Sequence, residues 1–229
     1  MSFQAPGGYS PNVSLNGTVG SMSTWGGTTT IYSSGNVSTH TMIRGTLHVT
    51  VGGYVRNFTG SGQINVEGEV ARMIIQDGGL AAASSTVTIA GVVGTVVLNS
   101  AAVVTIASRG FVASISMSNT AAPSTVALVV YGNVSTSTLM GGSTVVSAGA
   151  AITRHVQLGG AVTLVANSMI SYLTGFGTFL ITGGSVGQLF VTGPTFVIVR
   201  GTVTNAFIQA SINMSNTAAP STVAYKPLL

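Results

Sequence analysis

The hydrophobic residues of this chain recur in a short phrase that combines strict alternation with a glycine. The clearest copy is Thr46–Asn57, in which Leu47, Val49 and Val51 alternate with other residues and Gly53 follows. Alternation with a period of two predicts a strand with one buried face, and the glycine marks a turn. Related copies follow one another along the chain at intervals of 15 to 23 residues. The fold is therefore predicted to be a repeat.

Eleven copies align when the glycine of each Gly-x-Val phrase, or its equivalent in two degenerate copies, serves as an anchor. The position two residues after the anchor and the position four residues before it are aliphatic in every copy. The first position helped to choose the anchors. The second position was not used for that choice, so its aliphatic residues are the independent evidence for the repeat. Units of this length are too short for two helices and a turn, and their β-branched residues favour strands.

The repeat predicts an all-β protein with a single domain, a β-solenoid of about eleven rungs of 15 to 23 residues. The solenoid is expected to occupy residues 12–224, after an irregular lead-in over 1–11 and before a stub at 225–229. The two aliphatic positions form its predicted core. Representative core residues are Val49, Val55, Ile64, Val70, Val87, Val93, Ile106, Val112, Leu128, Val134, Leu180, Val186, Val197 and Val203.

Alternation also predicts an outer face, made of the residues three and five positions before each anchor. These residues are mostly polar in the early copies and apolar in the later ones. Contiguous apolar surface usually marks an interface, so an oligomer interface is expected there, unless the C-terminal segment folds over it. The interface residues predicted on this basis are Val129, Val145, Val165, Phe179, Ile181, Phe196 and Ile198.

Composition narrows the classes of function. Only ten of the 229 side chains are charged, and there is no cysteine, which excludes disulfides and thiolate metal sites. The net charge of +4 comes from scattered arginines, whereas nucleic-acid binding usually needs clustered basic residues, so no nucleic-acid partner is predicted. No apolar run approaches the ~18 residues of a membrane span. The first residues do not resemble a Sec signal peptide.

Candidate catalytic and metal-binding residues are few. Glu67 and Glu69 stand two apart, which in a strand gives the roughly 5–10 Å between carboxylates that a glycosidase needs, and Asp77 is the other acid. A solvated corner of the solenoid is the favoured interpretation of this pair. His40 and His155 share one position relative to their anchors but lie six rungs, or about 30 Å, apart, so they cannot share a metal. No catalytic residue, metal or cofactor is predicted, and the protein is expected not to be an enzyme.

The stretch TLHVTVGGYVRNFTGSGQINVEGEVARMIIQDGG, Thr46–Gly79, resembles the β-helical passenger repeats of AIDA-type autotransporter adhesins. Those repeats also alternate Val-rich strands with Gly-Gly corners and Asn/Thr ladders. The resemblance implies a right-handed β-helix that works as a surface adhesin or scaffold, and it brings no catalytic residues.

We therefore expect a structural or adhesive solenoid that associates with copies of itself in a surface layer, a fibre or a virion coat. Its expected location is the extracellular surface or the virion, and surface glycans are a further candidate partner. The alternative is a β-helix that binds carbohydrate or cleaves polysaccharides.

Overall fold

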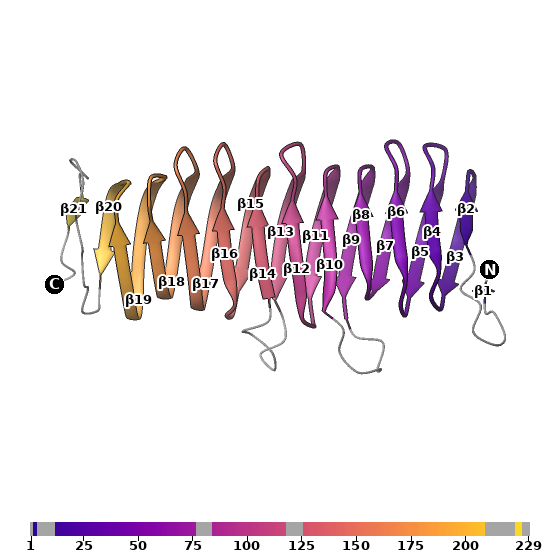
Figure 1. The fold of residues 1–229 in the computed structure, drawn as a ribbon, viewed down its shortest axis with the longest axis horizontal. Coiled ribbons are helices and arrows are strands. Elements are labelled where there is room, and N and C mark those ends of the chain that lie inside the picture. Colours follow the sequence, from indigo (N-terminus) through magenta and orange to yellow (C-terminus); the bar gives the residue numbers. More distant parts are fainter. Residues whose placement is uncertain (1, 4–11, 77–83, 118–125, 209–222, 226–229) are drawn as a thin grey trace.

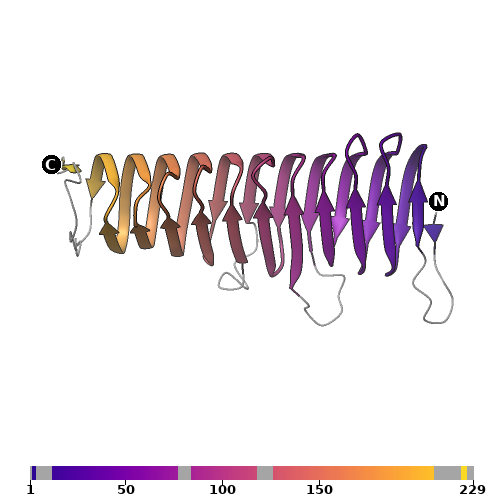
Figure 2. The same cartoon turned by 45° about the horizontal axis from the view of Figure 1, so that its top comes forward.

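The computed structural model describes residues 2–3, 12–76, 84–117, 126–208 and 223–225. In these residues every regular element is a strand, and all the strand pairings are parallel. The strands stack in pairs along one axis, with the two ends of the chain at opposite ends of the stack (Figures 1 and 2). The part of the chain described has no helix that could cross a membrane. The predicted all-β solenoid with a single domain is confirmed, with about ten full turns.

Each turn of the solenoid, here called a coil, contains one short strand and one long strand. The short strands are β2 (Val13–Leu15), β4 (Thr28–Ile31), β6 (Thr46–Val49), β8 (Gln63–Val66), β10 (Ser85–Ile89), β12 (Ala102–Ile106), β14 (Val126–Val130) and β16 (Ser143–Val146). The long strands are β3 (Thr18–Thr24), β5 (Asn36–Met42), β7 (Tyr54–Gly60), β9 (Glu69–Ile75), β11 (Val92–Leu98), β13 (Phe111–Met117), β15 (Asn133–Leu139) and β20 (Thr202–Ile208).

In three later coils the long segment runs on into the next short segment without a break. These continuous strands are β17 (Ala151–Leu164), β18 (Met169–Ile181) and β19 (Ser185–Val199). Two further short strands pair at the ends of the stack: β1 (Ser2–Phe3) with β3, and β21 (Val223–Tyr225) with β20. The rest of the predicted lead-in and stub lies outside the described residues, so their roles stay predictions.

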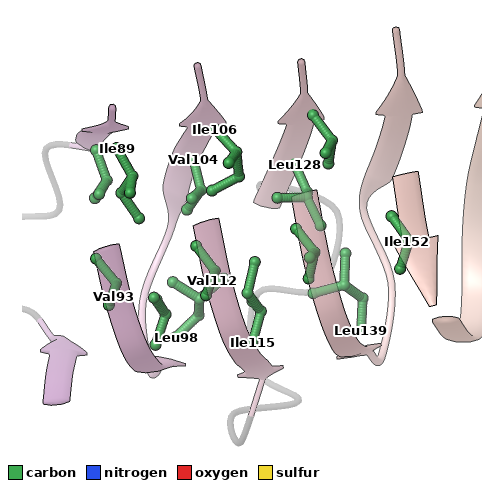
Figure 3. Packing of buried hydrophobic residues seen from close by; sticks show 14 of the residues in the cluster. Ile89, Val93, Leu98, Val104, Ile106, Val112, Ile115, Leu128, Leu139 and Ile152 are labelled. Carbon is green, nitrogen blue, oxygen red and sulfur yellow. The ribbon is translucent and has the colours of Figure 1, made fainter. Parts of the chain in front are cut away.

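Every long strand bends after its second residue. In β11, Val93, Val96 and Leu98 are buried, whereas the two residues between Val93 and Val96 both face outward. Register between neighbouring long strands places equivalent residues directly beside each other, as with Val93 and Val112. Figure 3 shows these inward side chains meeting those of the short strands between the two sides of the coil. The core is therefore a set of columns that run along the solenoid axis.

Glycine occupies several of the described corners where a long strand leads into the next short strand. Gly62 and Gly160 have φ angles of +123° and +76°, which residues with a Cβ rarely adopt. A Cβ at Gly62 would overlap the carbonyl oxygen of Gly45, and one at Gly160 would overlap that of Gly142. Each clash involves the same corner of the preceding coil, so glycine lets adjacent corners stack at strand spacing.

The structure buries thirteen of the fourteen predicted core residues. Leu180 is the exception, because its side chain faces outward and is only half-buried. Its neighbours Phe179 and Ile181 were expected on the outer face, but both are fully buried. The prediction for these three residues is therefore wrong.

The error comes from the length of one corner. The last inward residue of a short strand precedes the anchor by two positions in some coils, as with Val66 and Gly68, and by four in others, as with Val49 and Gly53. Both offsets are even, and inward residues alternate along the strand. The residue four positions before the anchor therefore faces inward in both kinds of coil. Ile181 precedes Gly184 by three positions, and it pairs in register with Leu164 of the coil before. This odd offset inverts the expected faces.

The corrected faces predict opposite results for two phenylalanines. Phe179→Ala should lower the free energy of unfolding by about 3–5 kcal/mol, because it leaves a cavity in the core. Phe196→Ala should change it by no more than about 0.5 kcal/mol, since that side chain is 42 % exposed. Denaturant unfolding followed by circular dichroism measures both. A larger loss for Phe196→Ala would contradict the corrected faces.

Candidate functional site

An open groove crosses the outer side of the last four long segments and has a volume of about 700 Å³. The bend in each long segment turns two successive residues outward, and β17, β18, β19 and β20 each contribute one such pair. The lining residues are Thr153, Arg154, Ser171, Tyr172, Gly187, Gln188, Thr204 and Asn205. In-register pairing places Arg154, Tyr172, Gln188 and Asn205 in one column that runs along the axis.

A stack of side chains supports one side of this groove. The Arg154 guanidinium carbon lies 5.3 Å from the centre of the Tyr172 ring. The Tyr172 ring lies 5.0 Å from Phe190 at a tilt of 31°, and Phe190 stacks on Phe207 at 4.6 Å. Cation–π and aromatic contacts of this kind are favourable and have preferred geometries. Arg154 and Tyr172 therefore support each other's orientation in the folded protein.

The other polar side chains of the groove have no partner among the described residues. No hydrogen bond is formed there by the side chains of Thr153, Ser171, Gln188, Thr204 or Asn205. The two described carboxylates, Glu67 and Glu69, lie next to or in β9, which is four coils, or about 19 Å, away from Arg154 in β17. Within the part of the chain described, the groove thus combines a cation that no carboxylate neutralises with unpaired amide and hydroxyl groups.

A second polar cluster is buried inside the coils formed by β15, β16 and β17. Ser137 Oγ lies 2.6 Å from His155 Nδ1, and His155 Nε2 lies 3.0 Å from Gln157 Oε1. Thr144 donates to the same Gln157 oxygen at 3.3 Å. The Gln157 amide nitrogen donates to the carbonyl oxygens of Gly141 and Gly159.

These contacts fix the protonation of His155. Because Oε1 of Gln157 accepts, His155 Nε2 carries the hydrogen and Nδ1 accepts from the Ser137 hydroxyl. Burial lowers the pKa of His155 from 6.5 to about 4, against a smaller opposing effect of the bond to Gln157. Ser137, His155 and Gln157 are each at most 1 % exposed. A hydroxyl beside an imidazole could act as a nucleophile with its base, but no substrate reaches this pair in the folded coil.

His40 occupies the same inward column, six coils earlier. Its Nε2 lies 3.1 Å from Thr24 Oγ1, and its ring meets that of Phe58 edge to face at 5.5 Å. Its Nδ1 has no partner in the structure. Burial lowers the pKa of His40 from 6.5 to about 4. Both histidines are therefore neutral core residues at pH 7.

The two described acidic residues, Glu67 and Glu69, are exposed and flank Gly68 at the corner that leads into β9. Glu67 lines a hollow of about 150 Å³ together with His48 and Asn65, whose side-chain nitrogens are 3.4 Å apart. Glu69 begins β9 and does not line this hollow. Asp77 lies outside the described residues. Among the described residues no three His, Cys, Asp or Glu side chains come together in a way that could hold a metal ion.

The outer side of the later short strands is largely apolar, with Thr163, Ser143 and Thr178 as its polar residues, and we call it the short-strand face. One column of this face stacks five residues in register, and a second column flanks it. The first column consists of Val129, Val145, Thr163, Leu180 and Ile198, and the second of Ala127, Ser143, Ala161, Thr178 and Phe196. Val165 lies half-buried at the corner that follows the face. Of the seven predicted interface residues, Phe179 and Ile181 belong to the core instead.

Sequence reasoning missed both the groove and the buried cluster, although their columns are present in the repeat. The residues four positions after the last four anchors are Arg154, Tyr172, Gln188 and Asn205. The residues five positions after the anchors are apolar in most copies, and the polar exceptions are His40, Ser137 and His155. Reading these columns would have pointed to both sites.

Comparisons with protein-family models, with curated proteins and with solved structures found no match to this chain.

The lowered histidine pKa values predict a loss of stability in mild acid. Below pH 6.5 the unfolded chain binds protons at both histidines, but the folded chain does so only near pH 4. The folded state is therefore destabilised as pH falls from about 6.5 towards 4, by on the order of 3 kcal/mol for each histidine. Thermal unfolding at pH 7 and at pH 5 should show this fall while ordinary carboxylates stay ionised.

Two variants assign the effect to the buried imidazoles. His155→Leu should reduce the fall in melting temperature between pH 7 and pH 5, even though it also weakens the protein at pH 7 by leaving Ser137 and Gln157 unpaired. His48→Gln is the matched control, since that histidine faces outward, and it should leave the fall unchanged. An unchanged fall in His155→Leu would show that another group is responsible.

Proposed function

We propose that this protein is a structural, non-enzymatic β-solenoid that associates with copies of itself through the short-strand face. It would serve as a building block of a surface layer, a fibre or a virion coat, outside the cell or on the virion. The observation that carries this proposal is the apolar column of the short-strand face in the later coils.

The shape of the short-strand face suits contact with a second copy. Its five stacked residues extend over about 19 Å, since parallel strands are spaced by about 4.8 Å. Four residues of the flanking column have small side chains, and the fifth, Phe196, is 42 % exposed. Two sheet faces pack against each other at about 10 Å, with interdigitated side chains. Contiguous apolar surface on a folded protein usually marks such a contact.

Charge also favours self-association. Ten charged residues in 229 is far below the roughly 25–35 % of an ordinary soluble surface. None of the ten residues of the short-strand face is charged. Two such faces can therefore meet without removing ions from water, which would be costly.

The alternative function, carbohydrate binding, is favoured by one separate observation, the polar groove on the long segments. Its cleaving form has less support, because the described carboxylates lie about four coils from that groove. The groove could serve an adhesive solenoid without any catalysis.

Polar substitutions on the short-strand face should prevent assembly. The triple variant Val129→Thr, Leu180→Thr and Ile198→Thr introduces only threonine, a β-branched residue that is common in strands. Threonine already occupies the same column at Thr163. Sedimentation velocity across a range of concentrations should show assemblies for the natural sequence and monomers for this variant. The strand signal in circular dichroism should stay unchanged.

The matched control carries the same kind of substitution on the outward side of the long strands: Ile74→Thr, Val97→Thr and Val156→Thr. These side chains are half-buried and outward but do not belong to the short-strand face. This variant should assemble like the natural sequence. A monomeric natural sequence, or equal dissociation of both variants, would refute the proposed contact.

A further inference from the structure

We propose that the groove on the last four long segments binds an acidic polysaccharide of low charge density, meaning a linear glycan with a carboxylate on only some of its sugars. This site is separate from the short-strand face, so the inference goes beyond the proposed self-association; it rests on the alternative function, carbohydrate binding, and specifies the class of ligand. Three properties of the groove support it: its single cation, its unpaired polar groups and its direction along the axis.

The cation of the groove is suited to a carboxylate. Arg154 is exposed, and no described carboxylate lies near it. A guanidinium binds a carboxylate through two parallel hydrogen bonds, and these charge-assisted bonds are stronger than those between neutral groups. The contact with the Tyr172 ring orients the guanidinium, which lowers the cost of fixing it upon binding. An anionic group is therefore the favoured ligand at this end of the groove.

The rest of the groove is suited to hydroxyl groups. Gln188 and Asn205 offer amides, and Thr153, Ser171 and Thr204 offer hydroxyls, all without partners among the described residues. Amides and hydroxyls both donate and accept hydrogen bonds, as do the hydroxyls of a sugar. A ligand that presents many hydroxyls and few charges matches this lining better than an apolar one does.

The direction of the groove is suited to a linear polymer. Equivalent residues recur once per coil, at about 4.8 Å, which is close to the length of one sugar unit in an extended chain. Four successive coils line the groove. Successive sugars could therefore meet successive coils in similar positions.

Charge density distinguishes a glycan from a nucleic acid. A nucleic acid carries one phosphate for each nucleotide, and proteins bind it through several clustered Lys or Arg residues. The groove has one arginine among eight lining residues. Its neutral hydrogen-bonding groups outnumber its charge, as in a glycan with one acidic sugar in each repeating unit.

Isothermal titration with three polysaccharides tests the inference. Hyaluronan oligosaccharides carry one carboxylate for each disaccharide, dextran carries no charge, and heparin is densely charged. The natural sequence should bind the hyaluronan oligosaccharides more tightly than dextran. It should also bind them at least as tightly as heparin, because one arginine cannot use the extra charges of heparin.

Variants then locate the binding. Arg154→Gln should weaken hyaluronan binding by about tenfold or more, because a charge-assisted pair is lost. Arg72→Gln is the matched control, since Arg72 stands at the same position of β9 but outside the groove, and its affinity should stay within about twofold of the natural one. Circular dichroism should confirm that both variants fold.

Several results would overturn the inference. They are no hyaluronan binding by the natural sequence, equal affinity for dextran, tighter binding of heparin, or equal losses in Arg154→Gln and Arg72→Gln. The triple threonine variant of the short-strand face should retain hyaluronan binding. Glycan binding is tested by Arg154→Gln and self-association by the triple threonine variant. The two proposals can therefore fail independently of each other.

Discussion

The structure depends on one constraint, the in-register stacking of parallel coils at strand spacing. Every inward side chain must lie against the equivalent side chain of the next coil, because the backbone hydrogen bonds fix their register. Aliphatic columns satisfy this constraint along most of the axis, as Val93 and Val112 do in Figure 3. His155 brings a polar ring into one of these columns, where Ser137 of the preceding coil and Gln157 of its own strand are its hydrogen-bond partners. The glycine corners serve the same constraint by letting adjacent backbones approach closely.

This constraint explains how much of the fold the sequence could predict. Alternation and a repeated glycine phrase are enough to predict stacked strands, and a corner that is longer by two residues leaves the inward and outward faces unchanged. Val49 and Val66 therefore share one core column in spite of corners of different length. Ile181 precedes its anchor, Gly184, by an odd number of positions. Alternation alone cannot show from the sequence where the chain departs from its period of two. Leu180 was placed in the core for this reason alone.

The candidate sites were harder to predict, because they depend on the bend in the long strands. A simple alternation would place only one of Arg154 and its neighbour Thr153 outward, whereas the bend exposes both and so widens the groove. The column that contains Arg154 and Tyr172 can be read from the repeat, but their contact and the support from Phe190 are seen only in the folded structure. The same holds for Gln157, which lies two residues beyond His155 and joins it only because both point inward after the bend. Two outer surfaces with different chemistry thus share one regular core.

The chain contains no cysteine, so single cysteines can test directly which side chains face inward. The decisive positions are 179, 180 and 181, where the odd corner sets the faces. With Phe179→Cys, Leu180→Cys and Ile181→Cys, the rate of maleimide labelling should be measured under native conditions and again in denaturant. The three cysteines are introduced into the Val129→Thr, Ile198→Thr background, which is expected to leave the short-strand face uncovered. We expect Leu180→Cys to react much faster in the folded protein than the other two variants, which should react only after unfolding. Rapid native labelling at 179 and 181 with protection at 180 would contradict the columns on which the whole structure is built.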